Sequence, residues 1–239
     1  MRGTSLRRSV AAAPHLVWSV LFIIAPFLFI LYYSFTDKDG SFSFSNIADL
    51  FTWDYFSIFL RSISFAVIAT FICLLIAYPL AYALSRMKAH TQGILMMLIM
   101  LPMWMNLLIR TYCWMNLLET NGLINTLLGT DIVFLGTGGA VVLGMVYNFL
   151  PYMVLPICTV MSKIDKSLLD AADDLGCNPV RTVFKVVFPL SLSGVISGIT
   201  MVFVPSISTF YISQKMGGGS FDLIGDTIER QFMANTNYN

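Results

Sequence analysis

The most informative polar segment of this sequence is residues 164–190, which carries acidic and basic side chains between two long apolar runs. It contains no nucleophile–base pair and no metal-ligand set, so it is a candidate for contact with another protein rather than for catalysis. Ser167 followed three residues later by Asp170 predicts a capping box at the start of a helix. The apolar residues recur at steps of four, four and three, the spacing of one helical face: Ile164, Leu168, Ala172 and Leu175.

Turn and cap residues divide this segment into two short helices. Gly176 is predicted to take the left-handed conformation that ends the first helix. Asn178 is predicted to cap the second helix, and Pro179 to occupy its first position. Pro189 is predicted to end or kink the second helix before the next apolar run.

The spacing of the small residues in this segment resembles the EAA signature of ABC importer permeases. The chain has Asp170-Ala171-Ala172, three residues, Gly176, nine residues, Val186, one residue, and Phe188-Pro189. The signature reads E-A-A, three, G, nine, I, one, L-P, so every spacing matches. The resemblance implies a coupling helix seated in a groove of a cytoplasmic ATPase. The alternative is an ordinary charged loop without a coupling role. The residues expected to carry the coupling are Leu168, Asp170, Ala171, Ala172, Asp173, Gly176 and Pro189.

The composition is that of a membrane protein, because 57% of the 239 residues are apolar and 11% are charged, whereas soluble domains carry about 25% charged residues. The apolar runs predict a single all-α transmembrane domain, with residues 162–189 as a coupling loop and 214–239 as an outer interfacial segment. The first run could also be a signal peptide, but it has spanning length and no cleavage pattern after it. Five spans are predicted, at about 16–35, 58–84, 94–118, 140–161 and 190–213.

The charges of the loops predict the orientation. One side of the predicted membrane is basic and the other is mostly acidic, so the positive-inside rule places the N-terminus and the coupling loop in the cytoplasm. That is the side on which an ATPase could reach the coupling loop. The basic residues on it are Arg2, Arg7, Arg8, Arg86, Lys88, Lys163, Lys166, Arg181 and Lys185.

Two further patterns bear on packing. Gly194 and Gly198 are four residues apart in the last predicted span, which would let another helix approach closely. Glycines are also common in membrane helices without that role. In the outer segment, one apolar helical face predicts a short helix lying at the membrane interface: Phe221, Ile224, Ile228 and Phe232.

The family resemblance extends over nearly the whole chain and is strongest to spermidine/putrescine permease subunits. Residues 106–112, 150–156 and 210–218 carry it. It implies a type I (MetI-like) helical bundle in the bacterial plasma membrane. The implied partners are a second permease subunit, a dimer of ATPase subunits that bind ATP and Mg, and an extracytoplasmic polyamine-binding protein; no nucleic acid and no cofactor in this chain are expected. Such permeases usually have six spans, so a sixth is expected to be missing at the C-terminus, through truncation or in an unusual subunit.

The substrate path is less well defined by the sequence. The predicted spans contain no Asp or Glu, which favours a subunit that passes a polycation rather than one that holds it tightly. Arg110 is the one charge deep in an apolar segment; it is a functional candidate, although snorkelling or pairing with a partner helix explains it as well. The remaining candidates could equally form packing hydrogen bonds: Asn106, Tyr147, Asn148 and Tyr211.

Other functions fit the sequence less well. The glycine runs at 136–139 and 217–219 lack the Lys-Ser/Thr of a phosphate-binding loop, so the energy source is expected in a partner chain. The four cysteines and two histidines are scattered, which predicts neither disulfides nor a metal site. An ion-coupled secondary transporter would usually carry acids within its spans. A permease subunit for another solute, such as sulfate or iron, is the nearer alternative.

Overall fold

The computed structural model describes residues 14–36, 41–44, 47–48, 50–129, 131–219 and 221–234. The described chain is helical, and its only β-type pairing is an isolated bridge between Thr36 and Phe42. Two compact units are present: residues 1–57 with 231–239, and residues 58–230. Four apolar helices are long enough to cross a membrane, or five if one bent helix pair forms a single span.

The smaller unit contains the first apolar helix, Pro14–Ser34. Its most apolar window has a mean hydropathy of 2.3, which is enough for a membrane span. The helix includes a π-helical turn, η1 (Val20–Ile24), followed by α2 (Ala25–Ser34). The basic N-terminal residues Arg2, Arg7 and Arg8 lie outside the described residues.

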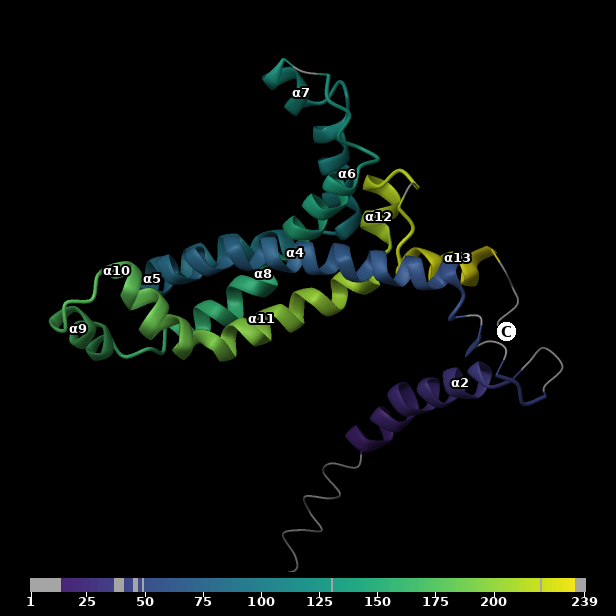
Figure 1. The fold of residues 1–239 in the computed structure, drawn as a ribbon, viewed down its shortest axis with the longest axis horizontal. Coiled ribbons are helices and arrows are strands. Elements are labelled where there is room, and N and C mark those ends of the chain that lie inside the picture. The colour runs from purple at the N-terminus through teal and green to yellow at the C-terminus, as the bar shows by residue number, and fades with distance from the viewer. Residues whose placement is uncertain are drawn as a thin grey trace, which may run out of the picture. The chain divides into compact units, whose positions relative to one another are not determined.

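Three long helices form the core of the larger unit and lie side by side in Figure 1: α4 (Trp53–Ser85), α8 (Gly138–Met161) and α11 (Phe188–Ser208). The α4 helix presents a stripe of small residues that are fully buried against its neighbours. Because the stripe has no long side chains, the helix backbones can approach closely. The stripe consists of Ala66, Ala69, Cys73, Ala77 and Ala81.

The predicted role of Gly194 and Gly198 in close packing is confirmed, with α8 as the neighbouring helix. A Cβ atom at Gly194 would lie 2.9 Å from the carbonyl oxygen of Pro156, and one at Gly198 would lie 2.7 Å from the sulfur of Met153. A side chain at Gly194 would meet fixed backbone, and one at Gly198 would have to displace the Met153 side chain, so both glycines let α11 lie close to α8.

The third predicted span, 94–118, is not one continuous helix. The chain forms α5 (Ala89–Trp104) and α6 (Leu107–Leu118), and the helix axes bend by 93° at the break between them. Met105 is extended, and the side chain of Asn106 accepts the Leu108 N–H at 2.7 Å, which starts a new helix. Hydropathy does not register an N-cap inside an apolar run, so the bend within the predicted span could not be foreseen, and the pair still counts as one span if both helices cross together. A short helix, α7 (Leu123–Leu128), follows.

Pro189 was predicted to end or kink the helix that precedes the last span, and of these two outcomes the helix end does not occur. Residues 179–208 run as one helix through α10 (Pro179–Thr182), the π-helical turn η2 (Val183–Val187) and α11. The N–H of Phe188 donates to the Val183 oxygen five residues earlier. This wider register accommodates the proline ring, which would clash with the carbonyl four residues back in a regular α-helix. The first span uses the same device, with η1 directly before Ala25 and Pro26.

The C-terminal part of the larger unit differs from the predicted boundaries. The last long helix ends at Ser208 rather than at residue 213, because Thr209 is extended, and α12 (Tyr211–Met216) is a separate helix. The predicted outer helix is present as α13 (Ile224–Ala234). Of its predicted apolar face, Ile228 and Phe232 are exposed, whereas the buried side carries Leu223, Asp226 and Thr227.

The contact between α8 and α11 predicts a steric effect on stability. Replacing Gly198 with Val should destabilise the folded protein by about 1–3 kcal/mol, the usual cost of overpacking, because the new side chain meets Met153. The measurement is the thermal unfolding midpoint of the purified protein in detergent. Gly93→Val is the matched control, since a Cβ at Gly93 in α5 meets nothing within 4 Å. Equal midpoints for the two variants would contradict the packing.

Candidate functional site

The segment that resembles the coupling motif folds as a helix–turn–helix at one end of the larger unit, where α9 (Lys166–Asp174) precedes α10 (Figure 1). The start of α9 differs from the predicted capping box. Asp165 is the N-cap, and its carboxylate accepts the Ser167 N–H at 3.0 Å. Ser167 lies inside the helix, and Asp170 is exposed. A carboxylate two residues before the donor caps a helix end as well as a hydroxyl does.

The predicted left-handed turn at Gly176 is confirmed. Gly176 has φ +75°, a conformation that side-chain-bearing residues rarely adopt. Its N–H donates to the Asp173 oxygen at 2.9 Å, and the N–H of Cys177 donates to the Ala172 oxygen at 3.0 Å. These two bonds form the Schellman motif that closes a helix C-terminus. The glycine therefore sets the angle at which the chain leaves α9.

The second helix begins as predicted. The side chain of Asn178 accepts the N–H groups of Val180 at 2.8 Å and Arg181 at 3.3 Å, and Pro179 is the first helical residue. From here the helix continues without interruption into α11. The second helix of the segment and the last long helix of the core are therefore one continuous element.

The predicted apolar face of the first helix is divided between two environments. Ile164 packs against the core together with Leu169, and Ala172 is buried. Leu168, within α9, and Leu175, its C-cap residue, are instead exposed. Exposed apolar residues from both helices define a surface that we term the coupling patch: Leu168 (46% exposed), Leu175 (84%), Val180 (61%) and Phe184 (69%).

Polar residues of the motif flank the coupling patch. Asp170 and Asp173 are exposed and form no ion pair among the described residues, and Ala171 between them is also exposed. Their side chains, like the patch, are free to contact another molecule. Pro189, the last residue of the motif, lies within the continuous helix, next to the π-helical turn.

The coupling helices rest on a connected core. Buried residues of α4, α8 and η2 form one cluster beside α9 and α10, and it includes Leu84, Met161 and Val187. Gln92 of α5 donates its amide to the hydroxyl of Ser162 at 2.7 Å and to the sulfur of Cys158 at 3.4 Å. The end of α8 from which the coupling segment departs is thus fixed to α5.

The candidate pathway residues lie on or beside α6. Asn106 is the exposed N-cap of this helix. Arg110 is half-buried, and its Nε and Nη1 atoms have no hydrogen-bond partner among the described residues. Tyr147 of α8 contacts Trp114 of α6 edge-to-face, with ring centroids 5.3 Å apart.

The other two pathway candidates have different surroundings. Tyr211, at the start of α12, lies beside Tyr112 of α6. Asn148 is buried and donates to the Gly144 oxygen at 2.8 Å, within its own helix. The structure therefore gathers Arg110, Tyr147 and Tyr211 around α6, whereas Asn148 is occupied inside α8.

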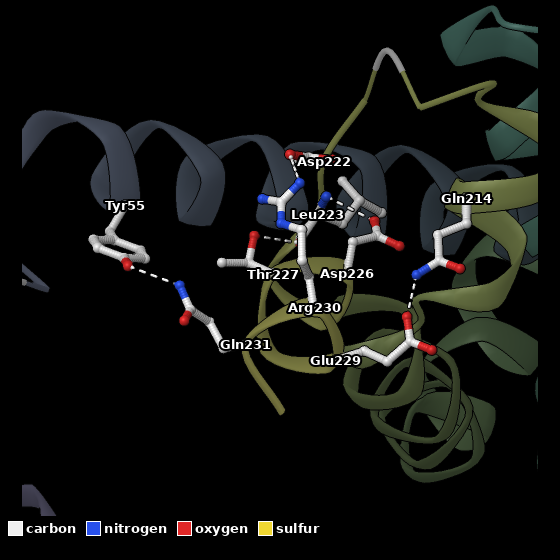
Figure 2. A network of polar contacts seen from close by, with 9 residues as sticks. All are labelled: Tyr55, Gln214, Asp222, Leu223, Asp226, Thr227, Glu229, Arg230 and Gln231. Carbon is white, nitrogen blue, oxygen red and sulfur yellow. Dashed lines mark hydrogen bonds and ion pairs between the residues drawn. The ribbon is translucent and has the colours of Figure 1, made fainter. Parts of the chain in front are cut away.

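A buried acid outside the apolar runs escaped the sequence reasoning. Asp226 is 4% exposed, and its Oδ2 atom accepts the Leu223 N–H at 2.8 Å (Figure 2). The next N–H, of Ile224, donates to the Ser62 hydroxyl of α4 at 2.8 Å. Asp226 thereby closes the first turn of α13, a role that its position three residues after Leu223 could have indicated.

Burial is the main cause that raises the pKa of the Asp226 carboxyl above its ordinary value. The nearby Ser213 hydroxyl and the Leu223 N–H act in the opposite direction, and the charges of Asp222 and Glu229 add to the rise. No group of three or more His, Cys, Asp or Glu side chains in the described part of the chain could hold a metal ion.

Residues 53–238 match the family described as "Binding-protein-dependent transport system inner membrane component". The spermidine/putrescine transport system permease protein PotB of Haemophilus influenzae is 36% identical over 92% of this chain and 82% of its own length. PotB of Escherichia coli K12 is 37% identical over 90% and 83%. A second Escherichia coli relative, the inner membrane ABC transporter permease protein YdcU, is 28% identical over 84% and 71%.

A solved structure shares the fold. A chain of a bacterial ABC transporter involved in the import of the acidic polysaccharide alginate superimposes with a TM-score of 0.73 over 98% of this chain and 87% of its own. Its identity to this chain is 16%, so this likeness concerns the fold alone. The family match covers more than half of the chain, and the PotB relatives exceed 30% identity over most of their length. The chain therefore belongs to the inner membrane components of binding-protein-dependent transport systems.

Proposed function

We propose that this chain is the transmembrane subunit of an ATP-driven importer that moves polyamines, such as spermidine and putrescine, into the cytoplasm. The observation that carries the proposal is the 36–37% identity, over 90% or more of the chain, to permeases named for spermidine and putrescine transport. The members of this family are components of transporters rather than enzymes. They work with an ATPase and a binding protein outside the membrane.

The coupling segment is the part of the chain that would receive mechanical work. Its apolar coupling patch is flanked by exposed Asp170, Ala171 and Asp173, which suits a groove on a folded ATPase domain. ATP and Mg would bind in the ATPase dimer. Closure of that dimer would displace α9, and the continuous helix from α10 through α11 would transmit the displacement to the bundle. The proposal requires that the N-terminus and the coupling segment face the cytoplasm, as the positive-inside rule predicts.

The cargo would pass between this chain and a second permease subunit. Three candidate residues for this route, Arg110, Tyr147 and Tyr211, gather around α6. Aromatic faces attract ammonium groups weakly, which permits release, while selection would rest with an extracytoplasmic polyamine-binding protein. A permease for another small solute is the alternative, and an ion-coupled transporter the more distant one.

Uptake by the reconstituted complex tests the cargo. Proteoliposomes that contain this chain, its second permease and the ATPases should import radiolabelled spermidine or putrescine when ATP and the binding protein are supplied. Unlabelled polyamines should compete, whereas sulfate and ferric iron should not. Uptake of one of those ions in place of polyamines would overturn the proposed cargo. Uptake that persists without ATP and follows an ion gradient would overturn the importer class.

Substitution of Asp170 tests the coupling segment. Asp170→Arg should abolish the ATP hydrolysis that the loaded binding protein stimulates, because it reverses an exposed charge beside the coupling patch. The complex should still assemble, since Asp170 is not part of the core. Asp131→Arg makes the same change in an exposed loop before α8 and should leave hydrolysis unchanged. Normal stimulated hydrolysis by the Asp170 variant would remove this residue from the contact.

Substitution of Gly176 tests the geometry of the same segment. Gly176→Val forces a β-branched residue to φ +75°, at a cost of about 1–3 kcal/mol, so the turn after α9 should change. Stimulated ATP hydrolysis should be lost, although the membrane bundle should remain folded. Gly93→Val is the control, because Gly93 has open space around its Cα. If both variants hydrolyse ATP equally well, the angle of the turn is irrelevant to coupling.

A further inference from the structure

The carboxylate of Asp226 is buried with one oxygen unused. Oδ2 accepts the Leu223 N–H, but Oδ1 has less than 1 Å² of exposed surface and no hydrogen-bond partner among the described residues. Figure 2 shows the contact between this carboxylate and the Leu223 N–H. A buried polar atom without a partner costs about 1–3 kcal/mol, and more if it is charged. A stable protein retains such an atom when its partner comes from elsewhere.

Helix capping accounts for only one of the two oxygen atoms of this carboxylate. The bond from Leu223 to Oδ2 satisfies one N–H at the start of α13, and a negative charge there gains about 0.3–1 kcal/mol from the helix dipole. An asparagine would accept the same N–H through its carbonyl oxygen. Capping therefore accounts for an oxygen at this position, but it does not account for a buried charge with a second, empty acceptor.

The neighbouring charges do not neutralise Asp226. Arg230 pairs with Asp222 at 2.9 Å, and both side chains are partly exposed. Glu229 receives the amide of Gln214, which is a neutral donor (Figure 2). Lys215 approaches the ring of Tyr112 at 6.0 Å; it is two residues from Ser213 on α12, which places the two side chains about 200° apart around the helix. Asp226 and Glu229 thus remain as uncompensated carboxylates.

The Ser213 hydroxyl supplies a second oxygen beside the carboxylate. It lies next to the Asp226 carboxyl, whose pKa it lowers, and it donates to the Phe210 oxygen at 2.8 Å. A hydroxyl has one proton and two acceptor lone pairs, so with its proton on Phe210 its oxygen can accept from a third group. An ammonium group carries three N–H donors and no acceptor, so it fits a site composed of a carboxylate oxygen and a hydroxyl oxygen.

We infer that Oδ1 of Asp226, with Ser213 beside it, accepts one ammonium group of an amine cargo at the α12–α13 end of the bundle, opposite the coupling segment. This inference rests on the proposed function, because it requires an organic cation as cargo. The packed conformation closes the oxygen off, so the site is filled in a conformation in which α12 and α13 are more open. The aromatic pair Tyr112–Tyr211 leads from the same short helix, α12, toward α6.

Kinetics of the complete importer test this inference. In proteoliposomes with the second permease, the ATPases and the binding protein, Asp226→Asn should lower the uptake of subsaturating spermidine by about tenfold or more, the effect of losing a charged hydrogen bond. The cap on Leu223 should persist, so assembly, the thermal midpoint and the ATP hydrolysis measured without binding protein should stay unchanged. Asp226→Glu should restore much of the uptake. Asp131→Asn, which removes an exposed charge elsewhere, should have no effect.

Each other outcome overturns the inference in a recognisable way. Wild-type uptake kinetics in Asp226→Asn would show that no cargo group uses the charge. If both Asp226→Asn and Asp226→Glu failed to assemble or had a lowered thermal unfolding midpoint, Asp226 would be a structural residue or a contact to the second permease. A wild-type importer that hydrolyses ATP but imports no polyamine would overturn the proposed function, and this inference with it.

Discussion

Close approach of α4 and α11 to α8 is the constraint on which the rest of this structure depends. Lipid tails are as apolar as the side chains they would replace, so helices in a bilayer associate through tight packing and a few polar contacts. The small stripe of α4 and the glycines of α11 supply the tight packing. The contacts from Cys73 to the Val146 oxygen at 3.8 Å and between Tyr78 and Ser191 at 3.3 Å supply polar ones. A coupling segment on one end can act on the bundle only because these helices are held together.

The local features of the coupling segment could be predicted from the sequence because each depends on a few adjacent residues. A left-handed turn requires glycine, and an asparagine before a proline provides a cap, whatever the surroundings. Gly176 and Asn178 therefore behave as predicted. The first residue of α9 is harder to predict from the sequence, because Asp165 and Ser167 are both suitable N-cap residues. In the structure the N-cap is Asp165.

Features that depend on register or on tertiary contacts were not accessible in the same way. A proline in an apolar run predicts a break, but a π-helical turn before Pro189 removes the clash and keeps the helix continuous. The reverse occurs at Asn106, where a cap hidden within an apolar run bends the chain by 93°. The stripe of small residues on α4 has a helical spacing that is visible in the sequence. Hydropathy, however, treats Ala and Leu alike as apolar, so it does not indicate which face is closely packed.

Arg110 of α6 and Asp226 of α13 both have polar atoms without a partner among the described residues, and they have different consequences for a polyamine route. The Nε and Nη1 donors of Arg110 demand an acceptor. A fixed cation near a path for polycations would repel them unless a carboxylate offsets it. Asp226 can become neutral, and burial already raises its pKa. An acid of this kind gains most when a cation approaches, because the cation favours ionisation and fills the empty acceptor at the same time. The affinity of such a site therefore follows the exposure of Asp226, which is the property that a change between open and closed conformations would alter.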